Sequence, residues 1–261
     1  MSGSAPLISV VTPCLNAAAT IEETLASVRA QGLGELVEHV VVDGGSSDGT
    51  VEILEDAEGV LFTSGPDRGL SDAMNKGVGA ARGEYIAWLN ADDYYLPGAL
   101  ARVRDALAAR PGAVWVTAPV VIVDGEGAEI RSRVTRYKRW FLRHYSHRSL
   151  LVQNFIAAPA TFVRRDALFE CGGFDERFKY SMDYDVWLKL ARLEDPVVID
   201  EPLSAFRMAG ESLSMTGFET QFAEHAQNAR EHGAGHPVAV LLNRVVSRAI
   251  VLAYRAMRQG R

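Results

Sequence analysis

The chain has 261 residues, of which 48% are hydrophobic and 23% are charged, a composition typical of one large or two small soluble globular domains. Its net charge of −6 gives no support to nucleic-acid binding, and its two cysteines are too few for a disulfide framework. The N-terminus shows no secretory signal, and no run of about 18 uncharged apolar residues marks a membrane span, so we expect a cytoplasmic protein.

The first half of the chain alternates strand-like and helix-like segments. The predicted strands are Leu7–Thr12, His39–Val42, Val60–Thr63 and Tyr85–Leu89. The predicted helices are Thr20–Ala30, one starting near Thr50, Ser71–Ala81 and one opened by Pro97. This alternation predicts a parallel sheet with crossover helices.

The second half is more mixed. Val114–Val123 and Ala128–Val134 predict a hairpin around Asp124, and Met182–Leu193 predicts a helix. Two further strands are predicted at Ala160–Val163 and Val197–Ile199. Everything from Phe218 onward reads as helical, so we divide the chain into a catalytic domain, residues 1–215, and a helical tail, residues 216–261.

Four predicted strands end in polar, turn-forming residues. These ends are Pro13-Cys-Leu-Asn16, Asp43 to Gly49, Ser64 to Gly69, and Asn90-Ala-Asp92-Asp93. The carboxyl ends of parallel strands share one edge, where open α/β sheets bind their ligands. Acids gathered there would repel each other unless a cation joined them, and Mg²⁺ or Mn²⁺ would bring phosphates with it. The alternative is that Asp, Asn and Gly merely form the turns.

The order of these segments resembles the family 2 glycosyltransferases. The resemblance rests on ISVVTPCLNAAATIEETLASV, VVDGGSSDGT, GPDRGLSDAMNKGVGAARGEYIAWLNADD and GGFDERFKYSMDYDVWLKLA, and it extends from Pro6 to about Ser214. It is closest to the bacterial polysaccharide and O-antigen branch. It implies an inverting enzyme with a GT-A fold: a Rossmann-like, mostly parallel sheet flanked by helices, here with a C-terminal helical appendage.

The resemblance implies a nucleotide-sugar donor and assigns residues to it. Asp43 accepts a hydrogen bond from the base, Asp67 lies over the base or ribose, and Lys76 faces the phosphates. The remaining assigned donor residues are Thr12, Pro13 and Asn16 against the base, and Asn90 and Asp92 of the metal motif.

The family's D-x-D metal motif stands here as Asn90-Ala-Asp92. The resemblance makes Asp92 the principal ligand of Mn²⁺ or Mg²⁺, with Asp93 as its helper or as a ribose contact. Ala209 occupies a position where the family often has a histidine, so a third protein ligand is not expected.

Asp183 matches the general base of inverting members, although Met182 replaces the glutamate that usually precedes it. A carboxylate suits this task because it takes the proton of the acceptor hydroxyl as the oxygen attacks. A first-turn acid also stabilises a helix N-terminus, so Asp183 can do both, whereas Asp185 has the better claim to a purely structural role.

Two other classes of protein compete with this interpretation. A non-catalytic nucleotide-sugar-binding module fits the departures at Asn90, Met182 and Ala209. A sugar-phosphate nucleotidyltransferase would need a Gly-rich basic loop after the first strand, which the chain lacks. We expect an enzyme that uses UDP-sugars by default, with a saccharide or lipid-linked saccharide as acceptor in cell-surface polysaccharide assembly.

The tail separates cations from apolar residues. On a helical wheel Arg244, Arg248, Arg255 and Arg258 share a narrow arc, and Gly233 to Arg261 contains no acid. The apolar side either packs on protein, including a second copy in a homodimer, or binds an anionic membrane at its inner face. His225 and His232 read as surface residues.

Overall fold

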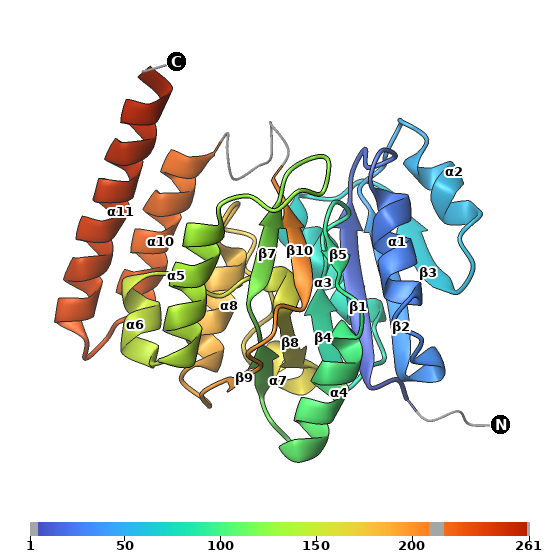
Figure 1. Ribbon diagram of the computed structural model, residues 1–261, viewed down its shortest axis with the longest axis horizontal. Helices are drawn as coiled ribbons and strands as arrows, with labels where there is room; N and C mark the ends of the chain where they lie inside the picture. The colour runs from blue at the N-terminus through green and yellow to red at the C-terminus, as the bar shows by residue number, and fades with distance from the viewer. Residues whose placement is uncertain (1–4, 209–216, 260–261) are drawn as a thin grey trace.

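The computed structural model describes residues 5–208 and 217–259 and has a seven-stranded central sheet of order β3-β2-β1-β4-β8-β6-β9 (Figure 1). Its strands are β1 (Ile8–Cys14), β2 (Val37–Asp43), β3 (Val60–Ser64), β4 (Tyr85–Trp88), β6 (Trp115–Thr117), β8 (Thr161–Arg164) and β9 (Val197–Val198). Only β8 runs antiparallel to its neighbours, so the predicted, mostly parallel sheet is confirmed.

A second, three-stranded sheet lies beside the first. It consists of β5 (Tyr94–Tyr95), β10 (Ser204–Arg207) and β7 (Val120–Val123), with β10 in the centre. The strand pattern did not predict β5 or β10. Their short lengths give almost no alternation to read, and β10 pairs with strands about 80 and 110 residues earlier in the chain.

Helices cover both faces of the central sheet (Figure 1). Successive strand residues point to opposite faces, so Val10 packs with α1 (Ile21–Arg29) and α4 (Ala99–Ala109), whereas Val11 faces α3 (Leu70–Ala80). The face of Val11 is also covered by α7 (Arg165–Glu170) and α8 (Met182–Leu190). At Gly77 of α3 an added Cβ would collide with Val11, so this glycine permits the close approach of helix and strand.

The first strand continues beyond its predicted end. Pro13 lies inside β1 because β1 and β4 separate after the Val11–Trp88 pair. The Val11 carbonyl faces β4, and alternate residues direct their backbone groups to the same side. The missing N–H of Pro13 therefore falls where no partner strand remains.

The predicted hairpin around Asp124 is confirmed at its turn, where Val123 and Glu129 form an antiparallel bridge, but its strands differ from the prediction. Residues 114–123 form two strands, β6 and β7, which belong to different sheets on either side of Pro119. Instead of a return strand, the chain makes one isolated bridge at Glu129 and then enters α5 (Ser132–Arg143). β7 finds its partner in β10, which local pattern does not reveal.

Among the residues that the structure describes, the remaining α-helices are α2 (Thr50–Glu55), α6 (His147–Val152), α10 (Phe218–His232) and α11 (Pro237–Gln259), and Gly34–Leu36 and Ala158–Ala160 form short 3-10 helices. The helices α10 and α11 confirm the predicted helical tail and lie at one edge of the molecule (Figure 1). Within the described residues, one helix, Pro237–Arg255, is long and apolar enough to cross a membrane, with 17% of that window buried. Length and composition alone make this weak support for a span, and Arg244 and Arg248 interrupt the apolar run.

Candidate active site

Loops from four parallel strands meet at the carboxyl edge of the sheet, as the sequence predicts. The neighbouring strands β3, β2, β1 and β4 are parallel, and Cys14, Asp43 and Ser64 stand in register at the ends of β1, β2 and β3. The β4 end follows directly, since the Leu89 N–H donates to the Val11 carbonyl. This is the edge at which open α/β sheets bind ligands.

Asp43 is the centre of the loop after β2. Its carboxylate accepts hydrogen bonds from the N–H groups of Gly45 (3.0 Å) and Ser46 (3.0 Å) and from the hydroxyls of Ser64 (2.6 Å) and Ser46. Burial alone would raise the pKa of Asp43, but these donors outweigh it and hold the pKa below its ordinary value. Asp43 is therefore an ionised acceptor that shapes the loop around it.

Thr12 and Pro13 of β1, which the sequence analysis also assigns to the nucleotide-sugar donor, face the interior of the protein. The Thr12 hydroxyl is 2.9 Å from Nε2 of His39, and both side chains are buried, as is Pro13. Asn16 is exposed beyond the strand, has a left-handed φ of 52°, and accepts the Ser47 N–H through Oδ1 at 3.0 Å. Asn16 thus connects the loop after β1 to the loop after β2, whereas Thr12 and Pro13 are buried within β1.

Asp67 and Lys76 border the same loops from the β3 side. Asp67 accepts the Gly69 N–H at 2.8 Å. Its Oδ2 lies 2.6 Å from the position that a Cβ on Gly44 would occupy. A side chain at position 44 would therefore displace the Asp67 carboxylate from its present place. Lys76 Nζ lies 3.1 Å from the Pro66 carbonyl and 3.0 Å from Asp72, so its charge is held at the loop.

The Asn90–Asp93 segment carries two carboxylates in different surroundings, one fully buried and one half-buried. Asp93 is fully buried, with Oδ1 accepting the Arg207 N–H (2.9 Å) and Oδ2 accepting from Asn90 Nδ2 (3.1 Å). Burial and the neighbouring Asp92 raise the pKa of Asp93 well above its ordinary value. Asp92 is half-buried, and burial raises its pKa too.

These residues fit a divalent cation held mainly by its substrate. No three His, Cys, Asp or Glu side chains gather as a ligand set within residues 5–208 and 217–259. Asp92 is more exposed than the fully buried Asp93, and Mg²⁺ needs only one or two carboxylates beside substrate phosphates. The bonds to Asp93 give that residue a structural part. Ala209, where the family often has a histidine, lies outside the described residues.

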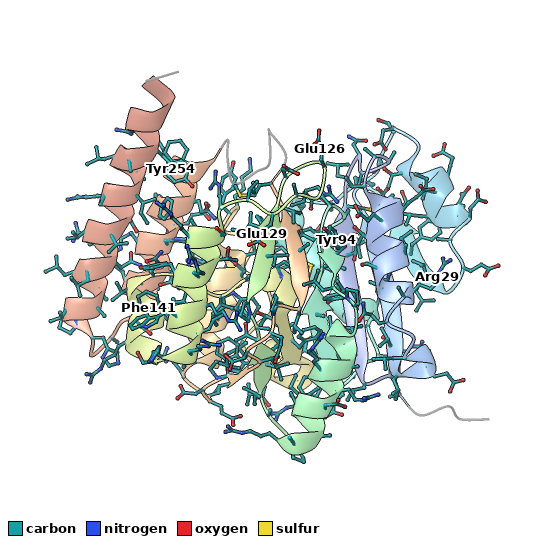
Figure 2. All side chains as sticks on the ribbon, viewed as in Figure 1. Arg29, Tyr94, Glu126, Glu129, Phe141 and Tyr254 are labelled. Carbon is teal, nitrogen blue, oxygen red and sulfur yellow. The ribbon has the colours of Figure 1, made fainter. Side chains whose placement is uncertain are left out.

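Arg207 holds the metal-motif segment in place. Its guanidinium donates to the carbonyls of Asp92 (3.1 Å) and Gly125 (2.7 Å), pairs with Glu23, and lies over the Tyr94 ring at 5.6 Å. Figure 2 shows Tyr94 among the strands of the small sheet. Arg207 is itself buried, and these partners occupy its guanidinium, so its contacts are those of a residue that holds the segment in place.

Asp183 lies in the first turn of α8, half-buried. Its Oδ1 accepts the Tyr184 N–H (2.7 Å), and Asn154 Nδ2 lies 3.4 Å from Oδ2. Burial raises the pKa of Asp183 to about 6, although these donors and the nearby Lys138 charge oppose the shift. A carboxylate with such a pKa remains ionised at pH 7 and is more basic than an ordinary aspartate.

Asp185 has different surroundings on the same helix. It is fully buried and pairs with Lys189 Nζ at 2.6 Å and with His232 Nε2 at 2.7 Å. These contacts assign Asp185 to the packing between α8 and α10. They support the choice of Asp183 over Asp185 as the base.

The segment leading into α8 lies against the donor loops. Arg68, in the loop after β3, pairs with Glu176 at 2.7 Å, and the Ser71 hydroxyl lies 3.3 Å from the Phe178 carbonyl. Trp88, at the end of β4, packs edge-on against Phe174. These contacts hold residues 174–178, which precede α8, beside the ends of β3 and β4.

Partners of this segment in the tail were missed by sequence reasoning. Buried Glu224 of α10 accepts the N–H groups of Lys179 (3.0 Å) and Tyr180 (2.9 Å) and the Ser181 hydroxyl (3.1 Å). The surface reading of His225 and His232 is wrong. His225 is buried, which lowers its pKa to about 3, and the His232 side chain is largely buried against Asp185.

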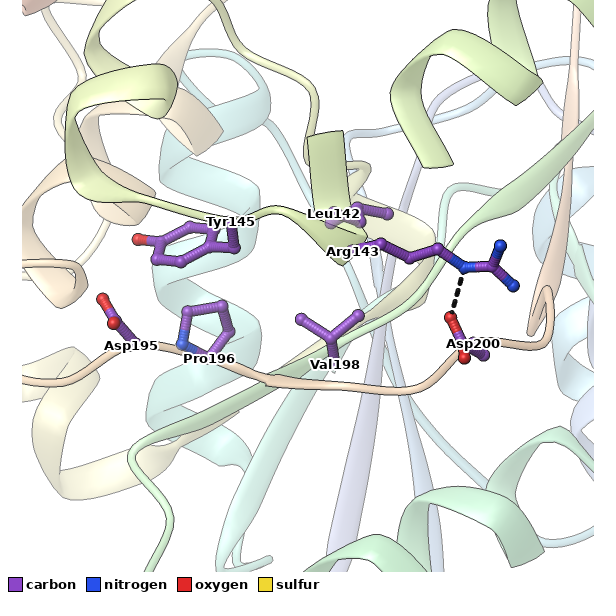
Figure 3. Close-up of a pocket in the computed structure, with 7 residues that line it drawn as sticks. All are labelled: Leu142, Arg143, Tyr145, Asp195, Pro196, Val198 and Asp200. Carbon is purple, nitrogen blue, oxygen red and sulfur yellow. Dashed lines mark hydrogen bonds and ion pairs between the residues drawn. The ribbon is translucent and has the colours of Figure 1, made fainter. Parts of the chain in front are cut away.

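A groove of about 380 Å³ lies apart from this edge (Figure 3). Its lining comes from the end of α5 and from the chain around β9, including Tyr145, Pro196 and the Arg143–Asp200 pair at 2.8 Å. None of its residues belongs to the four strand-end loops, so it is not part of the candidate site.

A mostly parallel sheet with acid-bearing loops at its carboxyl edge, and a further acid on an adjoining helix, is the architecture of the α/β proteins that bind their ligands at the strand ends. Residues 9–172 match the Glycosyl transferase family 2 domain, and the chain belongs to that family.

Relatives and solved structures agree with this assignment. An uncharacterized glycosyltransferase of Mycobacterium tuberculosis is 31% identical over 79% of this chain and 77% of its own length. A PGL/p-HBAD biosynthesis glycosyltransferase of Mycobacterium bovis is 29% identical over 95% and 96%.

Two solved structures share the GT-A fold. The mannosyltransferase PcManGT of Pyrobaculum calidifontis, in complex with GDP-Man and Mn²⁺, has a TM-score of 0.67 at 20% identity and covers 98% of this chain and 79% of that one. S. aureus TarS 1-349 with UDP-GlcNAc has a TM-score of 0.66 at 20% identity, covering 85% of this chain and 66% of that one. In a longer TarS chain the match covers 39% of its length.

Proposed function

We propose that this glycosyltransferase transfers a sugar from a nucleoside-diphosphate sugar to a hydroxyl acceptor with inversion, using Asp183 as general base. The observation that carries the proposal is the setting of Asp183. It lies half-buried at the start of α8, has no ion pair like those of Asp185 with any residue of 5–208 and 217–259, and has a pKa raised to about 6. UDP is our default nucleotide. A saccharide or lipid-linked saccharide in cell-surface polysaccharide assembly is our default acceptor.

The proposed reaction divides the residues between donor and acceptor. Asn16, Asp43 and Asp67, on the loops after β1, β2 and β3, would border the base and ribose. The acceptor oxygen attacks the anomeric carbon, its proton passes to Asp183, and the bond from that carbon to the phosphate oxygen breaks. The nucleoside diphosphate leaves from the opposite face of the sugar.

Asp92 is the residue we assign to Mn²⁺ or Mg²⁺, with Asp93 and Asn90 supporting its segment. When bound together with the donor, such a cation would offset the negative charge that develops on the diphosphate. The Lys76 ammonium, held at the β3 loop by Asp72, is the protein cation that we place near the phosphates.

A thermal-shift panel tests the donor site. UDP, GDP or dTDP at 100 times its dissociation constant should stabilise the protein by about 2.7 kcal/mol. Mn²⁺ should strengthen the shift in the wild type. Asp92→Ala should lose the metal-dependent part, whereas Asp56→Ala, an exposed acid at the end of α2, should not. No shift with any nucleotide at millimolar concentration, with or without Mn²⁺, would contradict the donor assignment.

A non-catalytic binding module stays the competing function, because it predicts the same shifts. Release of nucleoside diphosphate from a nucleotide sugar in the presence of an acceptor separates the two. Binding without any turnover across a panel of acceptors would favour the module.

A further inference from the structure

The last helix turns its apolar side away from the protein. Its packing side is small and polar: Ala239, Asn243 and Ser247, spaced four residues apart, are buried. Its outward side carries large hydrophobic residues that are 46–69% exposed: Val238, Leu241, Leu242, Val245 and Leu252. A helix of a soluble protein normally has the reverse arrangement, so this side is built for a further contact.

Contacts along its length hold α11 flat on the body. Asn243 Nδ2 donates to the carbonyls of Leu151 and Val152 on α6, each at 3.1 Å. Further along, Tyr254 accepts a hydrogen bond from Arg131 at 3.2 Å, and Arg255 pairs with Glu219 of α10 at 2.8 Å. Figure 1 shows α11 as the outermost helix, beside α10. A helix that crossed a bilayer would break these contacts and bury Asn243 in hydrocarbon.

Cations border the apolar side. Arg244 and Arg248 are exposed along one flank of the helix and make no ion pair with any residue of the described ranges. Arg148 is exposed near the other flank, where α6 and the start of α11 enclose a largely apolar hollow of about 390 Å³. No acid occurs between Gly233 and Arg261. An apolar strip edged by arginines complements an anionic lipid surface.

The same charges argue against a second copy as the occupant. In an antiparallel symmetric dimer through α11, the arginine flanks of both copies would lie together. In a parallel one, each flank would meet a helix that has no acid. Neither arrangement pairs Arg244 or Arg248 with a carboxylate on the opposite helix, and like charges brought together destabilise a contact.

We propose that α11 is a monotopic membrane-surface helix, which lies in the headgroup region of an anionic phospholipid layer with Leu241 and Val245 inserted and Arg244 and Arg248 on the phosphates. This inference is independent of the proposed donor chemistry, because none of its residues belongs to the strand-end loops.

Vesicle co-sedimentation tests it. The full chain should bind phosphatidylglycerol-containing vesicles and not pure phosphatidylcholine vesicles, and salt should weaken the binding. Arg244→Gln with Arg248→Gln should weaken it roughly 25-fold, since each cation near such a surface contributes about fivefold. Leu241→Ser with Val245→Ser should abolish it.

Two matched controls lie on the opposite edge of the molecule. Arg29→Gln on α1, labelled in Figure 2, removes an exposed arginine, and Leu61→Ser on β3 removes an exposed leucine. Neither should change vesicle binding. Equal, poor retention on both vesicle types at low salt would overturn the proposal. The proposal would also be overturned if light scattering showed a dimer that the double variant Leu241→Ser, Val245→Ser dissociates, while no vesicle retained the protein.

Discussion

Asp183 and Asp185 stand two residues apart on α8 in opposite circumstances. Asp185 is fully buried and has the Lys189 ammonium and the His232 imidazole as partners within 2.7 Å. Asp183 has one firm donor, the Tyr184 N–H, and a longer contact with Asn154. A buried, paired carboxylate cannot easily take a proton from an acceptor, whereas one with a raised pKa and few donors can.

Asp183→Asn should therefore leave donor-induced thermal shifts near normal and reduce turnover by about 10²–10⁴-fold, the usual share of general-base catalysis. Steady-state kinetics with a working acceptor measure this. Asp185→Asn is the matched variant, and its main defect should be lower stability. Full turnover by Asp183→Asn together with an inactive but folded Asp185→Asn would show that the base assignment is wrong.

The raised pKa of Asp183 also predicts a stability effect of definite sign. The folded protein binds this proton more tightly than the unfolded chain, so Asp183 costs no stability below pH 4. The cost develops as the pH rises from about 4 to the folded pKa of about 6 and persists above it. Asp183→Asn removes the charge, so its thermal midpoint should equal or exceed that of wild type at pH 8, with less advantage at pH 4.5. A variant clearly less stable than wild type at pH 8 would contradict this.

Sequence reasoning reached the acids of the site but not their partners. Asp43, Asp67 and Asp92 follow strands whose pattern is readable, so parallel pairing is enough to bring them to one edge. The bonds that set Asp93 apart from Asp92 come from Arg207, 114 residues later in the chain, and the Arg207 guanidinium in turn pairs with Glu23. No local spacing encodes contacts of that range.

At the scale of elements, α10 supports α8. Glu224 satisfies three donors of the turn at Lys179–Ser181, and Asn228 Nδ2 donates to the Ser181 carbonyl at 3.1 Å. Ser181 precedes Asp183 by two residues, so the contacts with α10 fix the start of α8, where the proposed base lies. The tail pattern predicted a helix here, but polar residues on its buried side concealed which side would pack.

Glu224→Ala should unfold more easily by about 1–3 kcal/mol, because it leaves buried donors without an acceptor. Turnover should fall further than donor binding, since the displaced turn carries Asp183 and not the nucleotide loops. Urea unfolding and kinetics measure the two effects. Glu231→Ala, an exposed acid of the same helix, should stay within about 1 kcal/mol of wild type. If Glu224→Ala and Glu231→Ala changed stability and turnover equally, α10 would have no role in positioning Asp183.

On the scale of the whole molecule, the two parts that we divide at residue 215 share one interior. Ala239 of α11 belongs to the core cluster of α8, and Tyr184 packs edge-on against His225 at 5.0 Å. The Asp185–His232 pair also crosses this division. The residues that predicted a separate tail show its composition, but they do not show how it is attached to the rest of the protein. Its attachment depends on polar contacts that hydrophobic periodicity does not register.

These shared contacts predict that the chain unfolds as one cooperative unit and that residues 1–215 alone are poorly stable. Removing the tail leaves Asp185 without its hydrogen bond to His232 and the donors of the 179–181 turn without Glu224, and a buried group left without its hydrogen-bond partner costs about 1–3 kcal/mol. For a chain of this size a loss of about 3 kcal/mol lowers the thermal midpoint by roughly 6 °C or more. Calorimetry of the full chain, of residues 1–215 and of residues 1–235, which keep α10, measures this. Residues 1–235 should recover much of the loss. A midpoint for residues 1–215 equal to that of the full chain would instead establish the tail as a separate appendage.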